Sequence, residues 1–271
     1  MPNSLIPYKN EAIKAKKSLG QNFLIDDNIL SKISELDSNI SNSIILEIGP
    51  GYGALTRKLL KHNPLKIFAI EKDNQFSPYL DKIKDENYDR FDFVIADALT
   101  YDYNFLLSKK LKIFSNLPFN VATKLLVTWL KSNLKSQQWD ILILMFQKEV
   151  AARIVADIGS KSYGRLSLLT KLICNAQTEF DVPKNCFRPK PRVTSTMIKF
   201  SALPKPRYAC NFNILEKIIY LAFNQRRKVI KNSLKSLHAD ISSILIRCNI
   251  SPQCRPEVIT LRQYCDLSLE F

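Results

Sequence analysis

The sequence predicts an α/β protein with a doubly wound, mostly parallel sheet, followed by a small helical domain. Three observations support this prediction. Short apolar segments with strand character alternate with segments of helical spacing over most of the chain. The first of these strands runs directly into a glycine-rich turn, which is typical of nucleotide-binding α/β sheets. From about residue 204 onward the pattern is helical, with no clear strand.

The expected sheet has seven strands. Strands that alternate with helices imply parallel neighbours joined by right-handed crossovers. The expected strands are 44–48, 66–71, 92–97, 112–116, 140–146, 178–182 and 193–200. Helices are expected at about 28–36, 54–60, 121–134, 148–157 and 166–173, where apolar residues recur at helical spacing.

Composition divides the chain into three parts. Residues 1–17 are polar and are expected to form a flexible N-terminal arm. Residues 18–203 hold the alternation of strands and helices, which ends near a proline-rich stretch. Residues 204–271 form the predicted helical domain, and the stretch 205–235 has eight Lys or Arg residues and one acidic residue.

The overall charge indicates a polyanionic partner. The net charge is +15 at pH 7, which favours nucleic acid or an acidic membrane surface. The longest apolar runs, 141–146 and 218–223, are too short to span a membrane. No signal-peptide pattern is present and the six cysteines form no CxxC pair, so we expect a cytoplasmic protein with reduced thiols and no metal site.

The stretch 44–53, which reads IILEIGPGYG, is the first candidate binding element. Four apolar residues around Glu47 predict a buried strand, and Gly49, Gly51 and Gly53 follow at alternate positions. Glycine allows positive φ and a close approach of the backbone to a ligand. The turn lacks the third, helix-packing glycine of a dinucleotide fingerprint, so alone it indicates either a nucleoside-type ligand or a tight turn without one.

Polar residues end the next expected strands at the same edge of the sheet, where ligands bind in open α/β folds. Glu71 comes 22 residues after Gly49 and is suited to accept hydrogen bonds from ribose hydroxyls. Asp97 ends the third strand and is suited to the exocyclic amine of adenine, and residues 116–119 end the fourth. Both NAD and S-adenosylmethionine present such a nucleoside.

The sequence NLPF at 116–119 favours methyl transfer to an exocyclic amine. The lone pair of such an amine is delocalised into the ring, which makes it a poor nucleophile. The Asn116 side-chain oxygen and the Leu117 carbonyl can accept hydrogen bonds from the amine and favour a more tetrahedral nitrogen. Pro118 fixes the turn, and Phe119 offers a face on which an extruded base stacks, worth about 1–3 kcal/mol. Because the methyl group of S-adenosylmethionine is already activated, alignment is the main requirement and no strong general base is needed.

Six stretches together resemble the KsgA-type ribosomal RNA adenine dimethyltransferases, over nearly the whole chain. They are 17–24 (KSLGQNFL), 47–53 (EIGPGYG), 116–119 (NLPF), 147–153 (QKEVAAR), 187–195 (FRPKPRVTS) and 222–234 (AFNQRRKVIKNSL). Many members of that family carry tyrosine where this chain has Phe119. Stacking survives this difference, whereas a hydrogen bond from the hydroxyl does not.

The resemblance implies a Rossmann-like class I methyltransferase fold with S-adenosylmethionine as cofactor, in which 18–203 is the catalytic domain and 204–271 binds RNA. It implies two successive methylations of each of two adjacent adenosines in the 3′-terminal hairpin loop of small-subunit (16S) rRNA, with a role in small-subunit biogenesis. The expected partner is the immature small subunit, and the expected state is a monomer. The implied cofactor contacts are Asn22, Leu24, Gly49, Gly51, Glu71, Asp97 and Asn116.

The RNA-contacting residues are expected on two parts of the chain. The cations of the 222–234 stretch are expected to face phosphates, which anchors RNA without sequence specificity. Phe187, on a proline-braced link, is a candidate second wall of the base pocket opposite Phe119. The candidate phosphate contacts are Arg226, Arg227, Lys228 and Lys231.

Three other functions share features with this sequence. A large-subunit (23S) rRNA adenine methyltransferase of the macrolide-resistance type shares the fold and the 116–119 motif, but the stretches 187–195 and 222–234 favour the small-subunit type. A non-catalytic ribosome-assembly or transcription factor on the same fold is disfavoured by intact Glu71, Asp97 and Asn116. An NAD-dependent dehydrogenase is disfavoured because no acid or base is evident for a hydride site.

Overall fold

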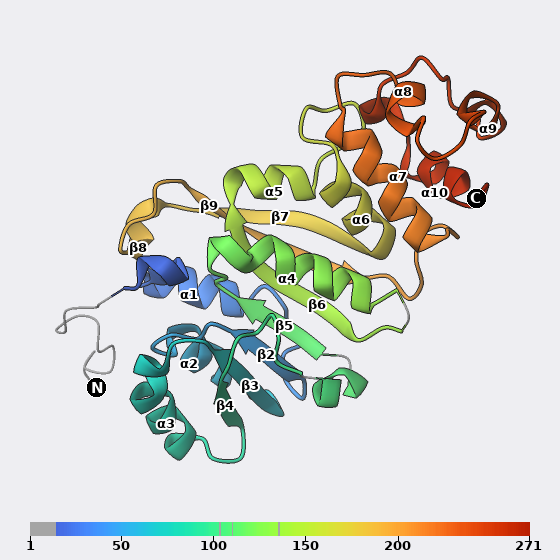
Figure 1. The fold of residues 1–271 in the computed structure, drawn as a ribbon. Helices are drawn as coiled ribbons and strands as arrows, with labels where there is room; N and C mark the ends of the chain where they lie inside the picture. Colours follow the sequence, from blue (N-terminus) through green and yellow to red (C-terminus); the bar gives the residue numbers. More distant parts are fainter. Residues whose placement is uncertain (1–14, 103, 110, 135) are drawn as a thin grey trace. The chain divides into compact units, whose positions relative to one another are not determined.

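The computed structural model describes residues 15–102, 104–109, 111–134 and 136–271, and it confirms the predicted α/β fold (Figure 1). Most of the expected N-terminal arm, residues 1–14, lies outside the described residues. In chain order the elements are η2 (Lys17–Leu19), β1 (Phe23–Leu24), α1 (Asp27–Ser34), β2 (Ile44–Ile48), α2 (Ala54–Leu60), β3 (Lys66–Glu71), η3 (Asn74–Phe76), α3 (Ser77–Glu86), β4 (Phe91–Ile95), η4 (Asn104–Lys109), β5 (Leu111–Ser115), α4 (Phe119–Ser132), β6 (Trp139–Gln147), α5 (Lys148–Ile154), α6 (Arg165–Ile173), β7 (Cys174–Val182), η5 (Lys184–Cys186), β8 (Phe187–Arg188), β9 (Ser195–Ala202), α7 (Phe212–Asn224), α8 (Ile230–Leu234), α9 (Ile241–Arg247), η6 (Pro256–Val258) and α10 (Leu261–Ser268).

The seven-stranded sheet has the order β4-β3-β2-β5-β6-β9-β7. The strands β4, β3, β2, β5 and β6 are parallel, and β9 runs antiparallel to β6. In the centre of the sheet, Leu46 of β2 pairs with Phe68 of β3 on one side and with Ile113 of β5 on the other. These strands are nearly continuous apolar runs because helices cover both faces of a parallel sheet.

The strand order reverses between β2 and β5. From β2 the chain moves outward to β3 and β4, and it then returns to β5 on the other side of β2. Right-handed crossovers therefore place α2 and α3 on one face and α4 on the other, and Figure 1 shows α4 crossing the face opposite α1 and α2. Ligands bind in the crevice at such a reversal, at the carboxyl ends of the strands.

The first compact unit comprises the chain up to Ala151 and Gln177–Ala202. In one core cluster, apolar residues of α1, α2 and α3 pack with the strands, for example Ile33, Leu59 and Ile83. A separate two-stranded antiparallel pair, β1 with β8, joins Leu24 to Phe187. This pair was not expected from the sequence, because two-residue strands leave no periodic pattern.

The second compact unit comprises Ala152–Ala176 and Leu203–Phe271. Helix α7 buries Leu215, Ile218 and Ile219, and α10 begins with a capping box between Thr260 and Gln263. Residues 205–271, all of which are described, contain no strand, which confirms the predicted helical C-terminal region.

Candidate functional site

A pocket lies at the carboxyl ends of β2, β3, β4 and β5. The space between its walls is about 930 Å³, including the part that opens to solvent. Most of the residues predicted for cofactor binding and catalysis line it. They are Asn22, Gly49, Gly51, Glu71, Asp97, Asn116, Leu117, Pro118 and Phe119.

The glycine turn after β2 is left-handed at each of its three glycines. The φ angles of Gly49, Gly51 and Gly53 are 68°, 55° and 75°. A Cβ atom on Gly53 would lie 2.1 Å from the Cδ1 of Ile83 in α3, so a side chain at this position, where α2 starts, requires the end of the Ile83 side chain to move. The third glycine of a dinucleotide fingerprint is absent from the sequence, and in the structure Gly53 lies against α3.

Glu71 ends β3 as a buried carboxylate, only 5% exposed. Its Oε2 accepts a hydrogen bond from the Gly51 N–H at 3.0 Å, and its Oε1 accepts one from the Asp73 N–H at 2.8 Å. Burial raises the pKa of Glu71, and the backbone N–H groups partly offset this. Each carboxylate oxygen has a second lone pair, so Glu71 is able to accept further hydrogen bonds from a ligand diol in the pocket.

Asp97 lies two residues beyond β4, which ends at Ile95 rather than at the predicted residue 97. Its Oδ1 accepts a hydrogen bond from the Leu99 N–H at 3.0 Å, and its Oδ2 pairs with the Lys72 ammonium at 2.8 Å. The Lys72 hydrogen bond, followed by the Leu99 N–H, lowers the pKa of Asp97. The carboxylate is therefore held ionised at the pocket rim, where it is a strong acceptor for an amine.

Asn116 follows β5 and is held by the N-terminal segment. Its Nδ2 donates a hydrogen bond to the Asn22 carbonyl at 3.2 Å. Because the amide nitrogen is engaged there, Oδ1 is the atom that can accept a hydrogen bond from a substrate amine. Pro118, with φ of −57°, precedes the first residue of α4, Phe119, whose half-buried ring is at the pocket wall.

An aromatic cluster supports the glycine turn from the side of the N-terminal segment. Phe23 contacts Tyr52 and Phe76 edge-to-face, with ring centroids 5.3 and 5.5 Å apart. Tyr52 also contacts Phe76 and Tyr79, at 4.8 and 4.7 Å. Edge-to-face pairs of this kind add about 0.5–1.5 kcal/mol each beyond their buried area, so the cluster joins the turn firmly to Phe23.

Glu47, within β2, is a second buried acid beside the turn. It is 2% exposed, and its Oε2 accepts a hydrogen bond from the Thr56 hydroxyl at 2.7 Å. Burial raises its pKa to about 8, although the Thr56 hydrogen bond acts in the opposite direction. Glu47 is therefore largely protonated at neutral pH.

Two predicted contacts do not line this pocket, although Leu24 lines a smaller one beside it with Gly49 and Asn116. Leu24 and Phe187 are 5% and 2% exposed, and both belong to the apolar core of the first unit. Their backbones pair in the β1–β8 sheet, so both side chains have a packing role here.

The four predicted phosphate contacts lie in the second compact unit and differ among themselves. The Arg226 guanidinium donates hydrogen bonds to the carbonyls of Lys161 and Ser160, at 2.5 and 3.2 Å, and lies 6.0 Å from the Phe223 ring centroid. Arg227 and Lys228 are exposed, and Lys231 is half-buried. Arg226 is thus committed to internal contacts, whereas Arg227 and Lys228 face solvent.

Several residues around the pocket were not predicted. Lys72 lines the pocket and pairs with Asp97. Asp73 does not line it, but accepts hydrogen bonds from Lys16 and Gln21 of the N-terminal segment. A signal existed in the sequence, because the triplet Glu71-Lys72-Asp73 places three charges at one strand end. Their partners are distant in sequence, so no local pattern identifies them.

Neither a metal cluster nor a membrane-spanning helix is found in the part of the chain that the structure describes. No group of three or more His, Cys, Asp or Glu side chains is placed to hold a metal ion. No helix there is long and apolar enough to cross a membrane.

Comparisons with known proteins concern the family and the fold of this chain. A family model described as "Ribosomal RNA adenine dimethylase" matches residues 12–271. A relative from Wolbachia pipientis subsp. Culex pipiens, named ribosomal RNA small subunit methyltransferase A, is 41% identical over 94% of this chain and 96% of its own length.

Two solved structures share the fold over most of this chain. The crystal structure of a dimethyladenosine transferase from Plasmodium falciparum has a TM-score of 0.75 and 25% identity, covering 92% of this chain and 97% of that one. The crystal structure of the 23S rRNA methyltransferase ErmE has a TM-score of 0.68 and 20% identity, covering 91% and 98%. The second likeness concerns the fold alone.

Proposed function

The chain belongs to the ribosomal RNA adenine dimethylase family, and we propose from this membership how its residues carry out the reaction. The protein is an S-adenosylmethionine-dependent methyltransferase that dimethylates adenine in small-subunit (16S) rRNA. The residue assignment rests on one observation: Glu71, Asp97 and Asn116, from three strand ends, line the same pocket. The targets of the enzyme are two adjacent adenosines in the 3′-terminal hairpin loop of 16S rRNA.

The pocket fits S-adenosylmethionine by the chemistry of its donors and acceptors. The buried Glu71 carboxylate would accept hydrogen bonds from the ribose hydroxyls, the ionised Asp97 would accept one from the adenine amine, and the turn at Gly49 and Gly51 would hold the methionine part. Asn22 completes this set from the N-terminal segment. When bound, the cofactor supplies an activated methyl group.

The residues at 116–119 act on the target base. Asn116 Oδ1 and the Leu117 carbonyl accept hydrogen bonds from the adenine amine and turn its lone pair toward the methyl donor. Phe119 stacks on the extruded base. No histidine is among the described residues that line the pocket, and the amine needs no strong base because its proton becomes acidic once the nitrogen is methylated.

The RNA-binding surface is assigned to residues 204–271, and the catalytic domain to 18–203. Arg227 and Lys228 are exposed and available to phosphates, which attract cations without regard to base sequence. The immature small subunit in the cytoplasm is the proposed partner, and the protein acts on it as a monomer.

Mass spectrometry of rRNA adenosines, from cells with and without the protein, tests the assignment. We expect N6,N6-dimethyladenosine in 16S rRNA to depend on the protein and 23S rRNA to be unchanged. A purified protein that binds S-adenosylmethionine but methylates neither immature small subunits nor free 16S rRNA at any salt concentration would contradict the enzyme assignment. Methylation of 23S rRNA alone would favour the macrolide-resistance type.

A further inference from the structure

The segment 16–22 forms one wall of the pocket without belonging to the central sheet. Residues 18–23 line the pocket, and the chain then enters β1 at Phe23. A wall made by a loop needs contacts that fix it, since its own backbone makes no strand ladder with the sheet.

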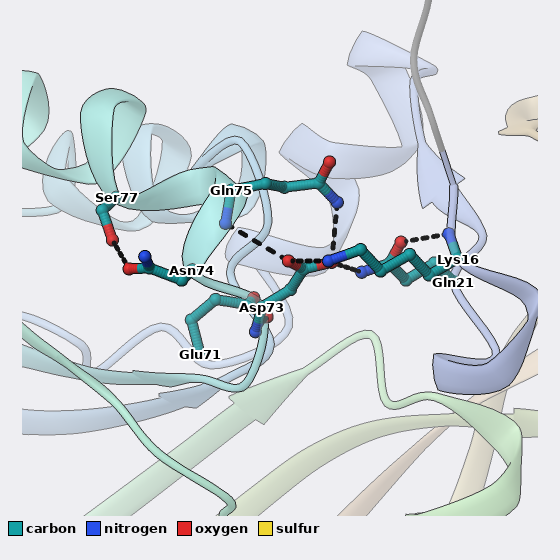
Figure 2. Close-up of polar contacts among 7 residues, drawn as sticks. All are labelled: Lys16, Gln21, Glu71, Asp73, Asn74, Gln75 and Ser77. Carbon is teal, nitrogen blue, oxygen red and sulfur yellow. Dashed lines mark hydrogen bonds and ion pairs between the residues drawn. The ribbon is translucent and has the colours of Figure 1, made fainter.

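One carboxylate, Asp73, receives a side-chain hydrogen bond from each of two residues of this segment. Its Oδ1 accepts a hydrogen bond from the Lys16 ammonium at 2.7 Å, and its Oδ2 accepts one from the Gln21 side-chain amide at 2.8 Å. Gln75 adds its backbone N–H at 3.2 Å and its side-chain amide at 2.7 Å. Figure 2 shows Lys16, Gln21 and Gln75 converging on Asp73.

The segment also closes on itself around this acid. The Lys16 N–H donates a hydrogen bond to the Gln21 Oε1 at 2.7 Å, so both amide atoms of Gln21 are engaged. The Asp73 side chain is 1% exposed. Burial acts to raise the pKa of Asp73, but the hydrogen bonds from Lys16 and Gln21 outweigh it and the pKa is lowered.

The next residue along the segment reaches the reaction centre. Asn22 accepts the hydrogen bond from the Asn116 side-chain amide through its carbonyl, and its own side chain donates to the Gly20 carbonyl at 3.1 Å. Displacement of residues 20–22 would therefore free the Asn116 amide to rotate and would exchange its oxygen and nitrogen in front of the substrate amine.

Apolar contacts of Phe23 and Leu24 anchor the same part of the chain independently of the Asp73 hydrogen bonds. Phe23 packs in the aromatic cluster with Tyr52 and Phe76, and Leu24 pairs with Phe187. Asp73 thus secures only the part of the segment that precedes Phe23, and its loss is expected to loosen the wall and leave the core intact.

We propose that Asp73, which does not line the pocket, is a positioning residue for methyl transfer: it holds segment 16–22 as a wall of the cofactor site and thereby fixes the side-chain amide of Asn116. This inference rests on the function proposed above. It assigns three tasks to residues 71–73, which start at the last residue of β3: Glu71 faces the ribose, Lys72 keeps Asp97 ionised and Asp73 holds the opposite wall.

The variant Asp73→Asn tests the proposal, because it keeps the shape of the side chain but removes the charge that holds the Lys16 ammonium and the Gln21 amide. The matched control is Asp92→Asn, which also loses a lysine-paired acid of the first unit, but one whose lysine partners, Lys66 and Lys84, lie outside segment 16–22. We expect Asp73→Asn to weaken S-adenosylhomocysteine binding by about tenfold in calorimetry and to lower kcat at saturating cofactor by a similar factor. Asp92→Asn should leave both unchanged.

A double-mutant cycle of Asp73→Asn and Asn116→Ala distinguishes an effect of Asp73 on the position of Asn116 from a general loss of structure. If Asp73 acts on kcat through Asn116, Asp73→Asn should lower kcat in the wild-type background and hardly at all in the Asn116→Ala background. Equal losses in both backgrounds, or wild-type binding and kcat in Asp73→Asn, would overturn the proposal. Failure of the wild-type protein itself to bind cofactor or transfer methyl groups would instead overturn the proposed function.

Discussion

At the scale of single residues, Asn116 joins the two halves of the reaction site. Its amide nitrogen is engaged by the Asn22 carbonyl, so its oxygen is assigned to the substrate amine. The cofactor acids Glu71 and Asp97 are separate from this contact. Binding of the cofactor and activation of the amine therefore depend on different side chains.

We expect Asn116→Ala to lower kcat by about 10²–10³-fold, the usual effect of removing one positioned polar contact in a transition state. The dissociation constant for S-adenosylhomocysteine should change by less than about threefold, because the adenosine contacts stay. Single-turnover methylation of immature small subunits and calorimetry measure the two effects. Phe119→Tyr is the control, since it keeps the aromatic face on which the base stacks and should keep methyl transfer. If Asn116→Ala transfers methyl groups at the wild-type rate, Asn116 has no part in the mechanism.

Glu47 gives a prediction for stability against pH. Its pKa rises on folding from 4.5 to about 8, so between these values the folded protein holds a proton that the unfolded chain has lost. The free energy of unfolding should therefore fall as pH rises through this window, by up to about 1.4 kcal/mol per pH unit. Urea unfolding of wild type and Glu47→Gln at pH 5, 6.5 and 8 should show a shallower slope in the variant.

Glu71 leaves part of the slope in that variant, because its pKa is raised as well. Asp92→Asn serves as the control, since the pKa of Asp92 is lowered below 3.8 and its contribution is lost only as pH falls through that lower range. A slope identical in wild type and Glu47→Gln would show that Glu47 is ionised in the folded protein.

The sequence predicts the pocket-lining residues that lie at strand ends, and it does not predict residues whose partners are distant along the chain. Glu71 and Asp97 were found because parallel strands end at one edge of a sheet. Asp73 was not found, because its function depends on Lys16 and Gln21, more than fifty residues away. Arg226 was assigned to RNA from its charge, and only the fold shows that it donates to two carbonyls.

At the scale of elements, the turn from β2 to α2 depends on Gly53. The residue combines a φ of 75° with a Cβ position only 2.1 Å from the Ile83 side chain. Ile83 is fully buried and has little room to move. The turn is therefore restricted to glycine by both backbone conformation and packing.

We expect Gly53→Ala to destabilise the protein by about 2–5 kcal/mol, from left-handed strain and overpacking together. Gly159→Ala is the matched control, because Gly159 has a φ of 81° but nothing within 4 Å of an added Cβ, so only the strain of about 1–2 kcal/mol applies. Chemical denaturation measures both. Adding Ile83→Val, which removes the clashing Cδ1, should restore part of the free energy of unfolding that Gly53→Ala loses. If the double variant is as unstable as Gly53→Ala alone, the cost lies in the backbone conformation and not in packing.

The central strands were predictable and the short pair β1–β8 was not. Strands β2 and β3 match their predicted bounds, because a buried parallel strand is a nearly continuous apolar run with a clear end. Strands β1 and β8 have two residues each, and only their pairing across the fold defines them. Helix α4, in turn, lies over the predicted helix 121–134 and buries Leu125 and Trp129.

At the scale of the whole molecule, the net charge is +15. Some of the basic side chains are available to bind RNA, whereas others make contacts that stabilise the fold. Arg226 and Arg227 are adjacent, but the first is bound to the Ser160 and Lys161 carbonyls and the second is exposed. Charge alone does not separate them, whereas the structure does.

We expect Arg227→Met to weaken RNA binding and to lower the slope of log K against log salt by about 1, the contribution of one phosphate contact. Arg226→Met should instead lower the free energy of unfolding, because two backbone carbonyls lose their donor. Filter binding of 16S rRNA from 50 to 300 mM salt and thermal unfolding of both variants distinguish the two roles. A salt slope unaltered in Arg227→Met would move the RNA surface elsewhere.

The pairing of β1 with β8 has a consequence for the order in which the protein becomes functional. Leu24 leaves the ribosome early in translation, but its partner Phe187 follows about 160 residues later. Such a non-local contact forms late, after most of the sheet has been synthesised. The nascent chain can thus assemble the glycine turn and bring Lys16 and Gln21 to Asp73 before Phe187 has been synthesised. The N-terminal segment therefore gains its polar anchor earlier in translation than its β1–β8 pairing.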